Sequence, residues 1–179
     1  MKYCIVALFD EDTYQVISPI QRNMSKKFRA NRNSPVPYIP LASIESSNID
    51  KIYPVVDKVL SPYKSFRVDA SDMVYIFEPT KTVNLKMDNK GYIKRISRSL
   101  SEMLTLNGFN IKSFEDNFIS LANLNYISKD NKKQDVKLNF PEIYDNYNYI
   151  KLRIKSFEIW KLPTVKKNVP LKSYVLKDF

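Results

Sequence analysis

Two seven-residue segments carry the side chains of this sequence that are best placed to do chemistry. One runs Tyr-Ile-Pro-Leu-Ala-Ser-Ile from Tyr38, and the other runs Phe-Ile-Ser-Leu-Ala-Asn-Leu from Phe118, 80 positions later. An aromatic residue leads both segments, and isoleucine, leucine and alanine recur at the second, fourth and fifth positions. Aromatic rings can stack on nucleobases, for about 1–3 kcal/mol each, and the Ser120 hydroxyl can donate a hydrogen bond. The repeated pattern predicts an internal duplication.

The scarcity of three residue types excludes several kinds of catalytic site. The chain has no histidine, one cysteine and two glycines. No histidine can therefore act as general base, nucleophile or metal ligand, and we expect neither a metal nor a cofactor. Two glycines cannot build a glycine-rich phosphate loop. Cys4 lies in an apolar run, which indicates a buried thiol, and a single cysteine cannot form an intrachain disulfide.

The charge of the chain suggests an anionic partner. The sequence carries 29 Lys and Arg against 19 Asp and Glu among its 179 residues, a formal net charge of +10. Such an excess favours binding to nucleic acid, nucleotides or an acidic membrane surface. An alternative stays open, because the chain is also rich in Lys, Asn, Ile and Tyr, as coding from an AT-rich genome would produce. The charge can therefore reflect composition rather than function.

The start of the chain reads as a strand rather than a signal peptide. The apolar run at residues 3–9 is short and stops at Asp10-Glu11-Asp12 without a typical cleavage site. No stretch is long enough to span a bilayer. These features predict a cytoplasmic protein, and the length and the 44% hydrophobic content suit one folded domain or two small lobes.

Hydrophobic periodicity predicts alternating helices and short strands. The expected strands are 3–9, 36–44, 66–68, 73–77, 83–87, 118–124, 149–160 and 174–176, with a turn at 69–72 and an exposed loop at 128–139. The expected helices begin within 10–13 or at Ser18-Pro19 and end near 28, cover 49–60 with a kink or shortening at Pro54, and run from a cap at Asp88 or Asn89 to Gly108. This order favours an α+β fold with two sheets or one split sheet.

Strand alternation gives the repeated segments a geometric meaning. It predicts that one face of each strand holds Tyr38, Pro40, Ala42 and Ile44 in the first and Phe118, Ser120, Ala122 and Leu124 in the second. Two equivalent strands would then bring Tyr38 and Phe118 to facing places across a central groove.

The arrangement resembles the 2H phosphoesterases, also called the LigT-like or 2′-5′ RNA ligase family. The resemblance covers the opening strand, both repeated strands and the late strand that ends Phe157-Glu158-Ile159-Trp160-Lys161-Leu162. It implies an α+β, two-lobed, pseudo-duplicated fold over residues 1–179, a single domain with antiparallel sheets around a central cleft and helices outside. The motif strands of that fold would lie near 36–44 and 116–124.

The resemblance also shows what this chain has lost. In the family, two His-x-Thr/Ser-x motifs supply a general acid and a general base for a 2′,3′-cyclic or 2′-5′ phosphodiester, and their hydroxyls hold the phosphate. Tyr38 and Phe118 fall at the two histidine positions, and Pro40 and Ser120 at the two hydroxyl positions. Phe118 cannot exchange a proton, and a phenol with an ordinary pKa of about 10 is a poor base. The two-histidine mechanism is therefore absent.

These observations predict a catalytically inactive protein that binds a nucleotide, a cyclic oligonucleotide or an RNA end in a basic, aromatic-walled cleft, and so sequesters a nucleotide signal. The expected ligand-binding residues are Tyr38, Pro40, Phe118 and Ser120. Three alternatives stay open. The two rings can fill a collapsed groove, the fold can serve as a protein-interaction module, or a phosphodiesterase site can be rebuilt from Tyr, Lys or Asp groups.

Overall fold

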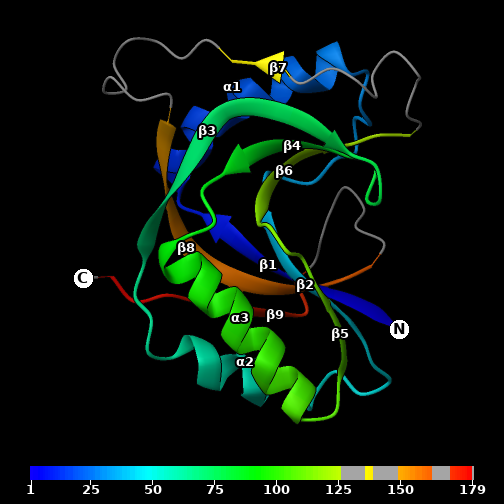
Figure 1. Cartoon of the computed structure of the whole chain (residues 1–179), viewed down its shortest axis with the longest axis vertical. Coiled ribbons are helices and arrows are strands. Elements are labelled where there is room, and N and C mark those ends of the chain that lie inside the picture. Colours follow the sequence, from blue (N-terminus) through cyan, green and yellow to red (C-terminus); the bar gives the residue numbers. More distant parts are fainter. Residues whose placement is uncertain (126–135, 139–148, 163–169, 179) are drawn as a thin grey trace.

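The computed structural model describes residues 1–125, 136–138, 149–162 and 170–178. Helices and strands alternate in the predicted manner along the chain (Figure 1). The elements are β1 (Lys2–Phe9), α1 (Glu11–Lys27), β2 (Ile39–Glu45), α2 (Tyr53–Leu60), β3 (Phe66–Phe77), β4 (Thr82–Met87), α3 (Gly91–Leu106), β5 (Asn110–Ser113), β6 (Phe118–Asn123), β7 (Val136–Lys137), β8 (Tyr149–Lys161) and β9 (Lys172–Val175).

The described strands form one split sheet rather than two separate sheets. Their order is β5-β2-β1-β8-β3-β4-β6, with β7 on β3 and β9 on β8, and neighbouring strands are antiparallel. The long strand β8 joins the halves, because its first part pairs with β3 and its second part with β1. The sheet curls until its two motif strands meet, where the amide of Tyr38 donates to the Ser120 carbonyl (3.3 Å) and the amide of Ser120 donates to the Tyr38 carbonyl (2.8 Å).

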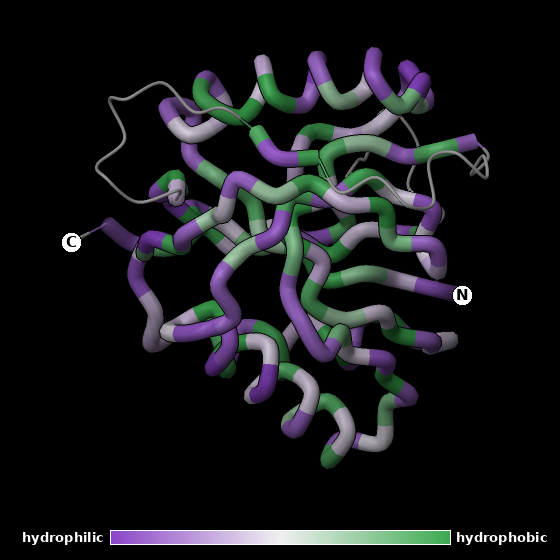
Figure 2. The backbone as a smooth tube through the Cα atoms, turned by 45° about the horizontal axis from the view of Figure 1, so that its top comes forward, coloured by the Kyte–Doolittle hydropathy of each residue, from purple (hydrophilic) through white to green (hydrophobic). Residues whose placement is uncertain are grey.

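The helices cover the outer face of each half, as the resemblance implied. α2 and α3 lie against the half that contains β1, β2 and β5, and α1 lies against the half that contains β4 and β6 (Figure 1). One hydrophobic core extends beneath the helices and through both halves. Figure 2 shows the hydrophobic residues gathered on the strands between the helices.

Local chemistry decides where the helices begin and end. Asp10 caps α1, because its Oδ1 accepts from the amide of Thr13 at 2.9 Å, so the alternative start at Ser18-Pro19 is wrong. Pro54 shortens the second helix as predicted, since it lies in the first turn of α2. Gly108 follows the end of α3 with φ of +82°, a left-handed conformation that favours glycine.

Neither Asp88 nor Asn89 caps α3, so that prediction is wrong. The residue at the cap position is Lys90, which makes no side-chain capping hydrogen bond. Asp88 instead forms an ion pair with Lys90 (2.7 Å). The Asn89 side chain turns to the segment before β6, where its Oδ1 accepts from the Asn117 amide (2.6 Å) and its Nδ2 donates to Asp116 (3.0 Å). The Asn89 side chain therefore makes a tertiary contact instead of the predicted helix cap.

Strand pairing also changes two local predictions. The turn expected at 69–72 is wrong, because β3 continues from Phe66 to Phe77 and absorbs an irregularity between Ala70 and Val74. The short strand β5 was not expected and pairs with β2. Most of the predicted loop 128–139 lies outside the described residues, but Val136 and Lys137 form β7 and pair with β3 instead of belonging to a loop.

Both motif strands contain a β-bulge at an equivalent leucine. In the β1–β2 pair, Ile5 lies opposite Ala42 and Val6 lies opposite Pro40, so Leu41 is the extra residue. In the β4–β6 pair, Ala122 and Ser120 lie opposite consecutive residues of β4, so Leu121 is extra there. The bulges are 80 positions apart, as are the first residues of α1 and α3. This correspondence supports the predicted duplication.

The bulges reverse the side-chain alternation that sequence predicted. Ile39, Leu41 and Ile44 all belong to the core beneath the helices, whereas Tyr38 packs with Cys4 and other residues on the opposite face. Ile44 therefore does not share a face with Tyr38, and in the second strand Leu124 lies in the core with Ile119 and Leu121. The expected common face ends at the bulge, because one extra residue exchanges the two sides of a strand.

We expect Leu41→Ala and Leu121→Ala each to lower the free energy of unfolding by about 2–5 kcal/mol, because each removes a nearly fully buried side chain and leaves a cavity. Urea denaturation followed by circular dichroism measures the change. Leu106→Ala makes the same substitution at a side chain that is 80% exposed, and it should stay within about 0.5 kcal/mol of the parent. A core-sized loss at only one of the two bulges would contradict their equivalence.

Candidate functional site

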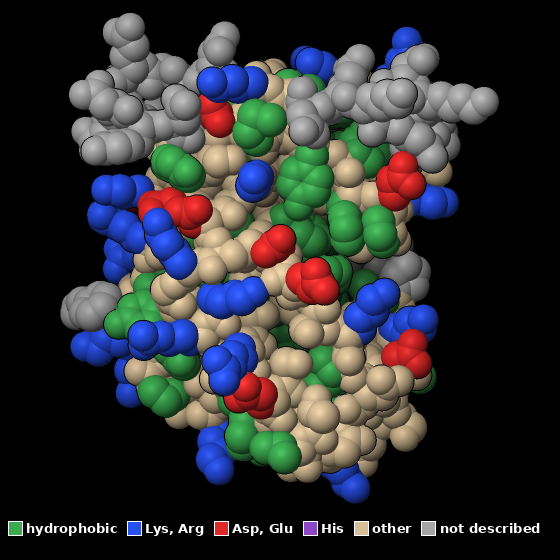
Figure 3. Space-filling view, in the orientation of Figure 1, with side chains coloured by type: hydrophobic (Ala, Val, Ile, Leu, Met, Phe, Trp, Pro, Cys, Tyr) green, Lys and Arg blue, Asp and Glu red, His purple; other side chains and the backbone are tan. Residues whose placement is uncertain are grey.

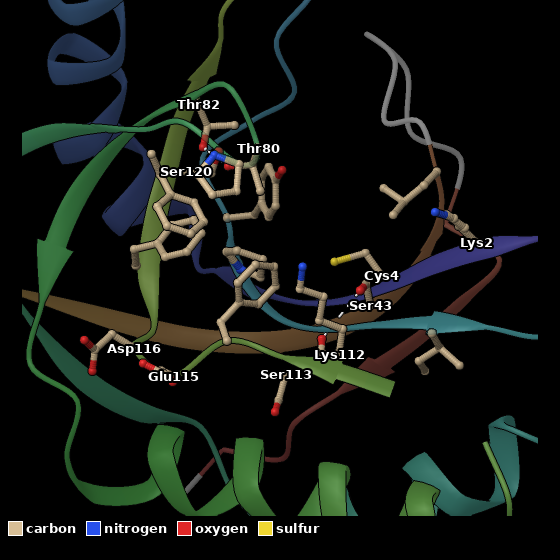
Figure 4. A pocket seen from close by; sticks show the side chains of 18 of the residues that line it. Lys2, Cys4, Ser43, Thr80, Thr82, Lys112, Ser113, Glu115, Asp116 and Ser120 are labelled. Carbon is tan, nitrogen blue, oxygen red and sulfur yellow. Dashed lines mark hydrogen bonds between the residues drawn. The ribbon is translucent and has the colours of Figure 1, made fainter. Parts of the chain in front are cut away.

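A pocket of about 1330 Å³ lies on the helix-free side of the curled sheet, where its two halves face each other (Figure 4). Tyr38, Pro40, Phe118 and Ser120 all line it. The structure therefore brings together the four residues selected from sequence. The pocket is larger than the usual range of about 300–1,000 Å³ for small-molecule sites, so it has room for a ligand bigger than one nucleoside.

The two aromatic residues at the motif positions are packed into the pocket wall. The Tyr38 ring lies 4.7 Å from that of Trp160 at 61°, and only 7% of Tyr38 is exposed. The Phe118 ring lies 5.4 Å from both Phe77 and Phe114, and 3% of Phe118 is exposed. Both rings are nearly buried against neighbouring rings, which is the packing that the groove-filling alternative predicts.

Three other aromatic rings reach the pocket and are only partly buried. They are Tyr75 and Phe77 of β3 and Phe114, which follows β5. Sequence reasoning missed them, because Phe77 and Tyr75 reach the pocket only through the β3–β4 pairing and Phe114 follows a strand that was not predicted. The one available signal was that Phe114 precedes the second motif by four positions.

The part of the pocket around Ser120 is rich in polar groups. Figure 4 shows Ser120, Thr80 and Thr82 together on one side, and the two threonine hydroxyls lie 2.6 Å apart. Ser120 is almost fully buried, with only 2% of the residue exposed. Even so, no described residue forms a hydrogen bond with its hydroxyl. Asn84 lies opposite Ser120 in the β4–β6 pair and is fully buried, and its Oδ1 has no partner in the described part of the chain.

The equivalent part of the other half is apolar. Val6 and Pro40 pair in the β1–β2 ladder as Asn84 and Ser120 pair in the β4–β6 ladder. Val6 packs in a small apolar cluster with Tyr38, Trp160 and Cys4. The two halves thus share a backbone arrangement but differ in their side chains. The motif strand of one half has the Ser120 hydroxyl where the other has Pro40, which has none.

The charges of the described lining differ from the basic cleft that sequence predicted. Two lysines, Lys2 and Lys112, and three carboxylates, Glu45, Glu115 and Asp116, line the pocket. Nζ of Lys2 lies 3.0 Å from Glu45 in an exposed ion pair. Figure 3 shows instead that lysine and arginine side chains gather on the outer surface, on the side where β3 and β8 cross. Net charge is a property of the whole chain, and it did not indicate the charge of the pocket.

Two groups in the lining that carry protons hold them firmly at neutral pH. Burial, with a smaller effect of the nearby Asp116 charge, raises the pKa of Tyr75 to about 12. Burial raises the pKa of the Cys4 thiol to about 12 as well. Tyr75 is therefore not a base near pH 7, and Cys4 is not a thiolate nucleophile.

No group of three or more acidic or cysteine side chains in the described residues is placed to hold a metal ion. In the same part of the chain, no helix combines the length and the apolar character needed to cross a membrane.

Known proteins resemble this chain in fold but not detectably in sequence. No family model and no curated protein matches the sequence. A protein of Thermus thermophilus matches the structure with a TM-score of 0.64 and 12% identity over 99% of both chains. E. coli LigT in its apo form matches with a TM-score of 0.62 and 12% identity, over 99% of this chain and 98% of that one.

Several matching structures of E. coli LigT contain a ligand. The complex with ATP has a TM-score of 0.57 and 13% identity, over 99% of this chain and 98% of that chain. Others hold NADP+, phosphate or 3′-AMP. Identities of 12–13% support the fold alone. The chain has a LigT-like 2H phosphoesterase fold, and it contains no histidine.

Proposed function

We propose that this protein binds a nucleotide, or the nucleotide end of an RNA, in the pocket and does not cleave its phosphodiester. The observation behind this proposal is that the pocket keeps a hydroxyl at one motif position but has no histidine at either of the two catalytic positions of the family. Ser120 lines the pocket at a motif hydroxyl position, while Tyr38 and Phe118 line it where the family has histidines. A group that can hold phosphate remains, and the groups that would transfer protons do not.

The remaining lining suits the parts of a nucleotide. The partly buried rings of Tyr75, Phe77 and Phe114 can stack on a nucleobase, for about 1–3 kcal/mol per base. Hydroxyls of Ser120, Thr80 and Thr82 can donate to phosphate or ribose oxygens, and Lys112 supplies a positive charge. The nucleotides held by E. coli LigT add a parallel from the same fold.

A ligand that is held and not converted is withheld from its other targets. The volume of about 1330 Å³ accommodates more than a mononucleotide, so a cyclic oligonucleotide is among the candidates. Sequestration of a nucleotide signal is the role that this combination of binding and inactivity favours.

Ser120→Ala should weaken nucleotide binding by about tenfold or more, because a hydrogen bond to a charged group contributes about 1.5–3 kcal/mol. Isothermal titration calorimetry with nucleoside monophosphates and 2′,3′-cyclic nucleotides of each base measures the affinity. Ser47→Ala is the control, since Ser47 is exposed and does not line the pocket. Equal affinities for both variants, or no heat with any nucleotide at high micromolar protein, would contradict the proposal.

Protein in excess over 2′,3′-cyclic nucleotides should leave them unchanged after hours of incubation, as judged by chromatography of the recovered nucleotide. The physical reason is the missing proton-transfer pair. A product that disappears with Ser120→Ala or with Glu115→Gln/Asp116→Asn would instead reveal a rebuilt catalytic site. That result would overturn the claim of inactivity but not the claim of binding.

A further inference from the structure

We infer that the pocket selects nucleotides with a single phosphate group and discriminates against polyphosphates. This inference rests on the proposed function and narrows its ligand to a mononucleotide, because a cyclic oligonucleotide would bring one negative charge with each of its phosphates. The carboxylates of the lining are the evidence, because they oppose each additional negative charge that a ligand brings into the pocket.

Two of the three carboxylates form no ion pair with a lysine of the described lining. The Lys2–Glu45 ion pair cancels one charge of each sign. The remaining charged side chains among the described residues of the lining are Lys112, Glu115 and Asp116. In this described part, one cation accompanies two anions, although the net charge of the chain is +10. Proteins that bind polyphosphates usually surround them with several cations or a glycine-rich loop of amides, and this lining has neither among its described residues.

The segment with the two carboxylates is anchored to the start of α3. The ammonium of Lys94 donates to the backbone carbonyl of Glu115 at 2.6 Å, from outside the pocket lining. Asn89 donates to the Asp116 carboxylate at 3.0 Å and accepts from the next amide, that of Asn117, at 2.6 Å. Lys94 thus contacts the backbone of Glu115. The neutral Asn89 leaves the charge of Asp116 in place.

Lys112 is placed to neutralise one phosphate. It lies opposite Ser43 in the β2–β5 pair, and its backbone carbonyl accepts from the Ser43 hydroxyl at 3.5 Å. Figure 4 shows its ammonium directed into the pocket, with Glu115 and Asp116 at one edge and Lys2 at the opposite edge. A phosphate near Lys112 gains a charge-assisted contact. Further phosphates would have no second unpaired cation in the described lining and would meet the two carboxylates.

Calorimetric titration with the mono-, di- and triphosphate of one nucleoside tests the inference at low ionic strength. We expect the monophosphate to bind about tenfold more tightly than the triphosphate, and the difference to shrink at high salt, where a Debye length of about 3 Å screens the carboxylates. Glu115→Gln/Asp116→Asn should reduce the monophosphate preference to about threefold or less, because it removes the two opposing charges.

Glu11→Gln/Asp12→Asn is the matched control. These residues are also a consecutive exposed Glu–Asp pair, they lie in the first turn of α1 and they do not line the pocket. The control loses the same net charge and should keep the full preference. An equal change in both variants would show that overall charge, and not the pocket, sets the selectivity, and it would overturn the inference.

Lys112→Ala should weaken monophosphate binding by about tenfold, whereas Lys58→Ala, at an exposed residue of α2 outside the lining, should not. The charge selectivity and the nucleotide binding can be contradicted separately. A triphosphate that binds as tightly as the monophosphate overturns the charge selectivity and leaves nucleotide binding intact. No binding of any nucleotide overturns the proposed function and the inference together.

Discussion

The pairing of Tyr38 with Ser120 is the constraint on which the pocket depends. Two backbone hydrogen bonds join these residues and bring together motif strands from distant parts of the chain. The next equivalent pair along an antiparallel ladder would be Pro40 with Phe118, and Pro40 has no N–H to donate. The strands meet at one point and cannot continue as an ordinary ladder. The two halves of the sheet are thereby held close, with the pocket between them.

The paired bulges determine which side chains reach that pocket. One extra leucine in each motif strand exchanges the two sides of the strand beyond it. Ser43 and Asn123 therefore join Pro40 and Ser120 in the lining, while Ile44 and Leu124 enter the core. The two repeats therefore share their backbone geometry and differ in their side chains. One repeat has the Ser120 hydroxyl next to the buried Asn84, and the other has Pro40 and Val6 at the equivalent positions.

Sequence was sufficient for features that local chemistry or repetition controls. The duplicated strands, the four lining residues, the shortening at Pro54 and the helix end at Gly108 are examples. Features that depend on a partner strand were not predictable. A bulge depends on the register with a neighbouring strand. The Asn89 side chain accepts a hydrogen bond from the distant Asn117 amide instead of capping a helix. Phe114 follows β5, which becomes a strand by pairing with β2. The charge of the pocket was not predictable for a similar reason, because most of the described Lys and Arg side chains do not line it.

Mass spectrometry of the small molecules released from purified protein is the most direct test of whether the pocket holds a nucleotide without cleaving it. Wild-type protein and Ser120→Ala would be purified in parallel, denatured, and their released ligands compared. We expect an intact nucleotide with one phosphate from the wild type, and much less of it from the variant. Release of the same compounds in equal amounts from both proteins, or of a hydrolysed product from the wild type alone, would contradict it.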